Sequence, residues 1–477
     1  EARRTIDAKD RVLAAKEQAD QRDASRYMDV DRDFQLRQLL NLHALSLRLN
    51  AFFRETLQAH IRESLRRHRQ ERTPPPLHLI RACLQRVAAD HEIIQQAVLQ
   101  RRWNRHGEGA YHVSEQALGL LLMDKLAIQA MGPFAHLLTK SKDEPLPLIV
   151  SYLSERTHMR RLPYAEDVIL IGVSYDRVPP AEDIFADKPL LGVGFPAAEL
   201  MAIPHEVGHH MYHHARLPET EQTFAQLSEQ FRENPYFRWC EEIFADLYGC
   251  VVAGPLSALS MQALLTSGDR ARVWKDDEEH PTPMVRVFIL AEMLRALKKY
   301  EEESGKSAAG ASLHYAFAEM VDQLDRDWAE ILRLWGYERV GTGAGRPARI
   351  YLPDPATVQL DKLVNVERML ASVRPIIVEF VERLLSAARF TPPPAGTENA
   401  LSLAIPWCRR DSRIPDDYHE EMAAIRQAVH KKAPIQSLIP DRVAAMAFRE
   451  AHPDRRLQEI LAAWGDSGPT GIGDHPG

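Results

Sequence analysis

Two histidines and a glutamate near the middle of the chain have the types and spacing of a metal-dependent hydrolytic site. His205, Glu206 and His209 form the pattern H-E-x-x-H. On an α-helix, residues four apart lie one turn apart on the same face, so both imidazoles can bind one Zn²⁺ ion. Glu206 reaches a metal-bound water and is placed to take its proton as a general base. The competing interpretation is an amphipathic helix with two incidental histidines.

A catalytic zinc ion needs a third protein ligand, and the sequence offers three ways to supply it. One known arrangement uses a histidine six residues after His209, but Ala215 occupies that position, and Tyr212 replaces the glycine between them. The same helix could supply a further histidine, but a rigid helix cannot present three successive turns to one tetrahedral ion. We therefore expect that these histidines face solvent or lie directly behind the ligands without binding the metal, namely His210, His213 and His214.

The remaining source of a third ligand is a carboxylate on a following helix. Glu242 and Asp246 stand four residues apart and share a helix face. Glu242 can bind the metal while Asp246 accepts a hydrogen bond from the free ring N–H of a ligating histidine and fixes its tautomer. The chain between His209 and Glu242 is long enough to end one helix and turn back with a second. Glu241, by contrast, has the pattern of an ordinary exposed acid.

The two motifs together resemble a known family. H-E-x-x-H at 205–209 followed by E-x-x-A-D at 242–246 is similar to the zincin metallopeptidases, specifically to the gluzincin branch that includes thermolysin. The resemblance covers roughly residues 145–290, and the gap before the second motif is longer than in thermolysin. It implies a peptidase with Glu206 as general base and one Zn²⁺ per chain, bound by His205, His209 and Glu242.

The resemblance also implies where substrate binds. In gluzincins an edge strand beside the active-site helix holds extended substrate by backbone pairing. The run Leu190–Phe195 precedes the H-E-x-x-H helix and resembles that strand. The implied substrate-binding residues are Gly192, Val193 and Gly194.

A third segment, HPTPMVR from His280 to Arg286, is similar to a His-Pro…Arg element of the prenyl-type and heat-shock membrane gluzincins. The resemblance implies that His280 stabilises the oxyanion and that Arg286 organises the site. A proline-initiated helix with a capping histidine is an equally good interpretation. Unlike those membrane relatives, this chain has no apolar run long enough to cross a bilayer.

The composition is that of an ordinary soluble globular protein. Of 477 residues, 45% are hydrophobic and 27% charged, and the formal net charge is −7. This mildly negative balance argues against a dedicated nucleic-acid binder. The four cysteines are scattered without a C-x-x-C pair, which argues against a disulfide framework or a thiolate zinc finger. No signal peptide is visible, so we expect a cytoplasmic protein without membrane insertion.

Apolar runs and turn residues predict an α+β chain that is predominantly helical. One helix is predicted from Leu77 to Arg102, after a break at Thr73–Pro76, and the H-E-x-x-H helix from Pro196 to about Ala215. Short strands are predicted at Leu146–Leu153, Asp167–Tyr175 and Leu190–Phe195. The family resemblance implies a zincin-like core in which a small mixed β-sheet packs on the active-site helix, flanked by helical regions.

Changes in this pattern along the chain, together with the family resemblance, predict the domain organisation. The expected parts are a helical N-terminal region over 1–140, a zincin-like metallopeptidase domain over 141–300, a helical C-terminal region over 301–466 and a flexible tail over 467–477.

The sequence favours a zinc-dependent endopeptidase of restricted substrate range, because the large helical flanks are expected to limit access or to dock a partner. Its partners would be a protein or peptide substrate and a regulatory protein, but no nucleic acid. The alternative is a non-catalytic or regulatory protein that binds a partner through the flanks of a zincin scaffold. Such proteins usually lose the general base or a ligand, and all four positions are intact here. A structural zinc site usually has four protein ligands.

Overall fold

The computed structural model divides into two compact units. Unit 1 combines Glu1–Leu121 with Ile414–Glu459, and unit 2 combines Leu122–Arg413 with Ile460–Gly477. The residues that the structure describes are 23–101, 103–106, 110–139, 147–174, 202–266, 273–274, 279–304, 314–335, 337, 339–340, 350–351, 364–388 and 452–464.

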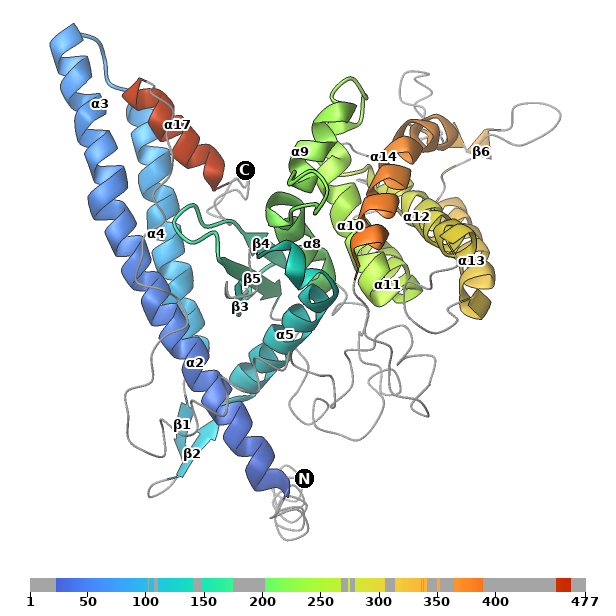
Figure 1. Ribbon diagram of the computed structural model, residues 1–477, viewed down its shortest axis with the longest axis horizontal. Coiled ribbons are helices and arrows are strands. Elements are labelled where there is room, and N and C mark those ends of the chain that lie inside the picture. Colours follow the sequence, from blue (N-terminus) through green and yellow to red (C-terminus); the bar gives the residue numbers. More distant parts are fainter. Residues whose placement is uncertain are drawn as a thin grey trace. The chain divides into compact units, whose positions relative to one another are not determined.

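Long helices dominate unit 1 (Figure 1): α2 (Asp23–Ala51), α3 (Gln58–Glu71) and α4 (Leu77–Gln100). The π-helical segment Phe52–Leu57 joins α2 to α3. After α3, Arg72 adopts the left-handed conformation that ends many helices. The run Thr73–Pro76 then prevents a continuous helix, because proline lacks the backbone N–H. The unit also contains the antiparallel strands β1 (Trp103–His106) and β2 (Ala110–Val113).

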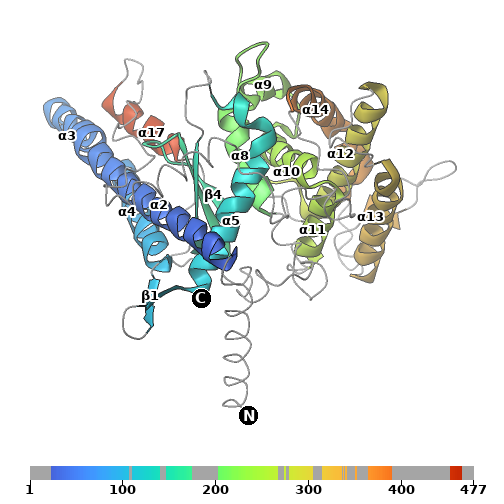
Figure 2. The ribbon, with the colours of Figure 1, turned by 60° about the horizontal axis from the view of Figure 1, so that its bottom comes forward.

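The core of unit 1 forms where α2 packs against α4. Its buried side chains include Leu42, Leu45, Leu49, Ile80, Cys83 and Ile94. The helix α17 (Pro453–Ala463) lies beside α3 (Figure 2) and is attached there through Asp454. The Asp454 carboxylate accepts a hydrogen bond from Ser64 Oγ at 2.5 Å and lies 2.7 Å from His68 Nε2. The helix α17 thus contacts α3, which lies far from it in the sequence.

Unit 2 contains a mixed three-stranded sheet of β3 (Leu148–Ser154), β4 (His158–Arg160) and β5 (Val168–Ser174). The strand order is β3–β5–β4, with β3 parallel and β4 antiparallel to β5. Every residue of β5 is buried, as expected for a central strand covered on both faces. The helix α5 (Glu115–Met131) anchors β3, because Asp124 accepts hydrogen bonds of 2.6 Å from the backbone N–H and the hydroxyl of Ser151.

The rest of unit 2 is mainly helical. Its helices are α8 (Ala202–His214), α9 (Phe224–Ser228), α10 (Cys240–Ala253), α11 (Pro255–Thr266), α12 (Pro283–Ser304), α13 (His314–Leu334) and α14 (Val366–Ala387). Short 3₁₀ turns cover Gly132–Leu137, Glu229–Phe231 and Phe237–Trp239. A small antiparallel sheet contains β6 (Arg339–Val340), β7 (Ile350–Tyr351) and β8 (Val364–Asn365). α8 packs on β4, β5 and α10, and α10 also packs on α11, α12 and α14.

A glycine permits the close approach of α8 to α10. A Cβ atom at Gly208 would lie 2.9 Å from the Ala245 Cα atom and 3.1 Å from the Tyr248 Cβ atom. Backbone cannot move away as the end of a flexible side chain can, so any larger residue at 208 must push the helices apart. The two helices can therefore present side chains to each other at short range.

The structure confirms the α+β class, with mostly helices and a small mixed sheet. The predicted strands at 146–153 and 167–175 correspond to β3 and β5, whereas the one at Leu190–Phe195 lies outside the described residues. The third strand of the described sheet is instead β4, which the sequence did not predict, and β1 and β2 interrupt the helical pattern expected for 1–140. Within the described residues, no helix is long and apolar enough to span a membrane.

We predict that Gly208→Ala destabilises the protein. Alanine normally favours a helix over glycine by about 1 kcal/mol. Overpacking costs about 1–3 kcal/mol, and the obstacle here is backbone, so we expect the free energy of unfolding to fall. Denaturant unfolding measures this change. Gly132→Ala is the matched control, since its Cβ would meet no atom within 4 Å. Equal stability of the two variants would contradict the close-packing explanation.

Candidate metal centre

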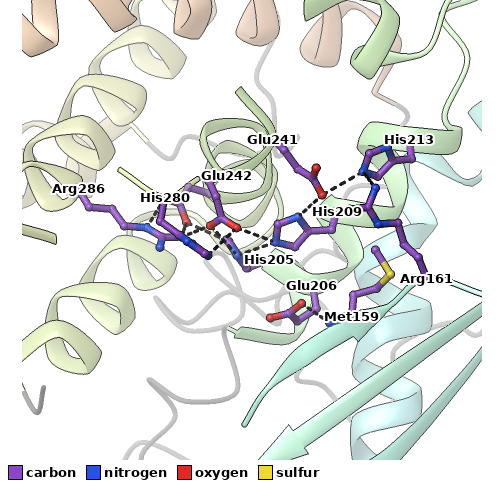
Figure 3. A network of polar contacts seen from close by, with 11 residues as sticks. Met159, Arg161, His205, Glu206, His209, His213, Glu241, Glu242, His280 and Arg286 are labelled. Atoms are coloured by element: carbon purple, nitrogen blue, oxygen red, sulfur yellow. Dashed lines mark hydrogen bonds and ion pairs between the residues drawn. The ribbon is translucent and has the colours of Figure 1, made fainter. Parts of the chain in front are cut away.

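Three side chains from two helices of unit 2 converge on one point. His205 and His209 project from α8, and Glu242 projects from α10 (Figure 3). The two Nε2 atoms lie 3.1 Å apart, and the nearest Glu242 oxygens lie 3.6 Å from His205 Nε2 and 3.4 Å from His209 Nε2. Ligand atoms about 2.0–2.1 Å from a tetrahedral zinc ion lie about 3.3–3.4 Å apart. This cluster could therefore hold one metal ion.

Asp246 and Arg286 lie behind the cluster, on its buried side. Asp246 is one turn after Glu242 on α10, and its Oδ1 atom lies 3.0 Å from His205 Nδ1. Arg286, on α12, donates hydrogen bonds of 2.8 Å to both Asp246 oxygens and one of 2.9 Å to Glu242 Oε2. Burial disfavours the charged form of Asp246, but Arg286 and His205 together hold its pKa below the usual value. The hydrogen bond from Arg286 fixes how Glu242 is oriented, and Asp246 places a negative charge beside the His205 ring.

Glu241 is not the ordinary exposed acid that its sequence pattern suggested. Its side chain is 29% exposed, and its Oε1 atom lies 3.0 Å from both His209 Nδ1 and His213 Nε2. Arg161 Nη1 lies 3.0 Å from the same nitrogen of His213. Adjacent residues on a helix point about 100° apart, and only the packing of α8 on α10 shows that Glu241 also faces a histidine. The expectation of an uninvolved acid was therefore wrong.

Acidic side chains determine the electrostatics of the cluster. Burial alone would lower the pKa of His209, but the charges of Glu242, Glu241 and Glu206 raise it to about 9. Burial also opposes ionisation of Glu242, yet the charges of His209 and Arg286 hold its pKa well below the usual value. In the absence of a metal ion the site therefore attracts a proton. The same negative field favours a bound cation.

Glu206 lies in the wall of a cavity, beside the edge strand β4. Its Oε2 atom accepts a hydrogen bond of 2.5 Å from the backbone N–H of Met159. Glu206 and the three clustered side chains line one cavity of about 1050 Å³, which exceeds the usual size of a small-molecule pocket. On another side the cavity is lined by apolar residues of α11, which are Met261, Leu264 and Leu265.

His280 lies at the open side of the cluster. Its Nε2 atom is 3.2 Å from Glu242 Oε1, and its side chain is 46% exposed and lines the same cavity. The following helix α12 begins after Thr282, whose carbonyl accepts hydrogen bonds from the N–H groups of Val285 and Arg286. The structure thus brings His280 to the cluster that contains Glu242.

Two other histidines of α8 pack against each other. His210 is 3% exposed, which contradicts the expected solvent-facing position, and its ring stacks on that of His214 at a centroid distance of 4.4 Å. Burial, together with nearby histidines, lowers the pKa of His210 well below its usual value and that of His214 to about 4. Both rings are therefore neutral near pH 7 and belong to the packing of the helix.

The tyrosines near the site are also packing residues. The Tyr212 hydroxyl lies 2.7 Å from Ser228 Oγ, and the buried Tyr248 hydroxyl donates to the Ala130 carbonyl at 2.7 Å.

The residues expected to bind substrate lie outside the described residues, namely Gly192, Val193 and Gly194.

We predict that Arg286→Met destabilises the protein by about 3–5 kcal/mol, because it leaves two buried carboxylates without their cation. Denaturant unfolding of the metal-free protein provides the measurement. The control is Arg374→Met, which removes the ion pair of Arg374 with Glu292, where the arginine is 53% exposed. An exposed pair contributes at most about 1 kcal/mol. The explanation fails if the two losses are similar.

We also predict that each chain binds one Zn²⁺ ion and gains stability from it. At a free zinc concentration 1000-fold above Kd, the free energy of unfolding should rise by about 4 kcal/mol. Metal analysis and thermal unfolding with and without a chelator measure both effects. The increase should vanish in His205→Ala/His209→Ala and persist in His91→Ala, which changes an exposed histidine of α4. An increase that persists in the double variant would place the metal elsewhere.

No protein-family model, curated protein or solved structure matches the chain. The assignment of this site therefore depends on its residues and their geometry. They establish a buried cluster of two histidines and a glutamate that could hold a metal ion.

Proposed function

We propose that the protein is a zinc-dependent endopeptidase. The observation that carries this proposal is the convergence of His205, His209 and Glu242 on one point, with Glu206 in the wall of the same cavity. Three protein ligands leave one tetrahedral position open, which is typical of catalytic and not of structural zinc sites. The resemblance of the two motifs to gluzincins supports the same class of reaction.

The donor set fits zinc. Two imidazoles and one carboxylate form a known catalytic zinc set, whereas Mg²⁺ and Ca²⁺ prefer oxygen ligands throughout. Non-haem iron oxygenases also use two histidines and a carboxylate. A further carboxylate at the general-base position, Glu206, favours hydrolysis over that chemistry. The excess negative charge that a dication would offset comes from Glu206, Glu241, Glu242 and Asp246.

Glu206 would act as the general base. A bound zinc ion would polarise the scissile carbonyl and lower the pKa of the attacking water. Glu206 takes the proton from this water and returns it to the leaving amine. The Met159 N–H holds Oε2 of this carboxylate, and within the described part of the chain Oε1 accepts no hydrogen bond. Oε1 is therefore the oxygen available for proton transfer.

Two further side chains would support the reaction. His280 is the candidate donor to the oxyanion, because its half-exposed ring reaches the cluster from the open side of the cavity. Arg286 holds Glu242 from the buried side. Extended substrate would pair with an edge strand, for which the family resemblance suggests 190–195. The described strand β4 is a second candidate, because its Met159 contacts the general base.

We predict that Glu206→Gln binds zinc as the parent does but cleaves peptides at least about 100-fold more slowly, because the amide cannot accept the proton. Zinc content and cleavage of a fluorogenic peptide library measure the two effects. Glu166→Gln, which changes an exposed acid before β5, is the control and should cleave at the parent's rate. Equal cleavage by the parent and Glu206→Gln would refute this role.

The helical flanks suggest that cleavage is restricted to few substrates. Terminal-peptide mass spectrometry on a cell lysate, with the parent compared with Glu206→Gln, would identify them. A zinc-binding parent that cleaves nothing in either assay would instead favour the partner-binding alternative. Rapid, indiscriminate degradation of casein would contradict the restricted range.

A further inference from the structure

Glu241 is a further carboxylate at the candidate metal site. It contacts the ligand His209 and is not itself one of the three candidate ligands. Glu241 immediately precedes Glu242 on α10, and its Oε1 atom lies 3.0 Å from His209 Nδ1. We propose that Glu241 is a positioning residue that orients His209 toward the metal ion, with His213 in turn holding Glu241. The inference rests on the metal site of the proposed function but does not depend on the peptidase reaction.

The two ring nitrogens of His209 point to different partners. Nε2 faces the cluster, 3.1 Å from His205 Nε2, whereas Nδ1 faces Glu241. When Nε2 binds a metal ion, Nδ1 carries the proton, and this N–H donates a hydrogen bond to a carboxylate oxygen. This hydrogen bond fixes both the tautomer and the plane of the ring, and it makes Nε2 a better donor to the metal.

A carboxylate of α10 also lies beside the other histidine. His205 Nδ1 is 3.0 Å from Asp246 Oδ1 but makes no hydrogen bond with it, whereas His209 Nδ1 is hydrogen-bonded to Glu241. The two carboxylates differ in their surroundings. Asp246 is buried and is held by two hydrogen bonds from Arg286, whereas Glu241 is partly exposed. Glu241 therefore depends on other support.

His213 provides part of that support. Its Nε2 atom lies 3.0 Å from Glu241 Oε1 and also 3.0 Å from Arg161 Nη1 (Figure 3). One ring nitrogen cannot donate to the carboxylate and accept from the guanidinium at the same time. His213 Nε2 is thus shared between Glu241 and Arg161. We therefore expect the loss of His213 to weaken zinc binding less than the loss of Glu241.

A purely structural explanation of Glu241 is available and makes a different prediction. Glu241 is in the first turn of α10, where an acidic side chain interacts favourably with the helix dipole. That role would change the stability of the metal-free protein and leave its affinity for metal untouched. Metal affinity and the geometry at the metal therefore distinguish the two explanations.

The test measures zinc affinity by competition with a chromophoric chelator. Glu241→Ala should bind zinc about 10–100-fold more weakly than the parent. Glu241→Gln should recover part of this loss, because its amide oxygen still accepts the hydrogen bond from Nδ1–H. The visible spectrum of the cobalt-substituted protein should change in Glu241→Ala and resemble the parent's in Glu241→Gln. Thermal unfolding of each metal-free variant checks the fold.

Glu233→Ala is the matched control. It removes an equal charge from an exposed position shortly before α10, and it should bind zinc with the parent's affinity. Parental affinity and an unchanged cobalt spectrum in Glu241→Ala would overturn the inference while leaving the proposed function intact. A similar loss in Glu233→Ala would also overturn it, because the effect would then come from net charge. A parent that binds no metal would overturn both proposals.

A double-mutant cycle tests whether His213 acts through Glu241. His213→Ala should weaken zinc binding less than Glu241→Ala does, and it should have no further effect in the Glu241→Ala background. Additive losses of affinity in the double variant would show that His213 acts independently, and would overturn this part of the inference.

Discussion

The candidate site depends on the close approach of α8 to α10. Gly208 leaves room for the Ala245 backbone, with only 2.9 Å between a hypothetical Cβ and the Ala245 Cα atom. At this separation His205 and His209 can meet Glu242 across the helix interface. A larger residue between the two histidines would separate the helices and the ligands together. Because packed helices resist sub-ångström changes, this spacing gives a rigid scaffold that can hold a ligand set before any metal binds.

The close packing of α8 and α10 buries charged side chains. Carboxylates such as Glu242 and Asp246 are buried, and buried charges are costly unless they are paired. Arg286, on α12, offsets the negative charges of Glu242 and Asp246. The candidate metal site therefore also depends on the packing of this third helix. The remaining negative charge raises the pKa of His209 to about 9 after the opposing effect of burial. A bound dication can take the place of that proton and offset the buried negative charge. The carboxylates that raise this pKa therefore also favour metal binding.

The sequence predicted those features that depend on local periodicity. The start of α4 at Leu77 and the strands β3 and β5 follow from turn residues and long apolar runs. β4 was missed because three residues are too few to show an alternating pattern, and its pairing with β5 is a long-range contact. In the site, the i, i+4 spacing of His205 and His209 predicted their proximity. Spacing could not predict that His210 is buried or that Glu241 reaches His209, since both depend on which helix lies opposite.

The two sides of the cluster differ in how firmly they are held, and this difference indicates how the site would work. On the buried side, Arg286 donates charge-assisted hydrogen bonds to Asp246 and to the candidate ligand Glu242, a geometry that suits stable metal binding. On the cavity side, Glu206 is held by one backbone N–H, and His280 is half exposed. Groups that must exchange protons or meet a substrate need that freedom. A site built only to retain a structural ion would need neither an open cavity nor a further carboxylate, Glu206, in its wall, so this asymmetry supports the proposed hydrolytic role.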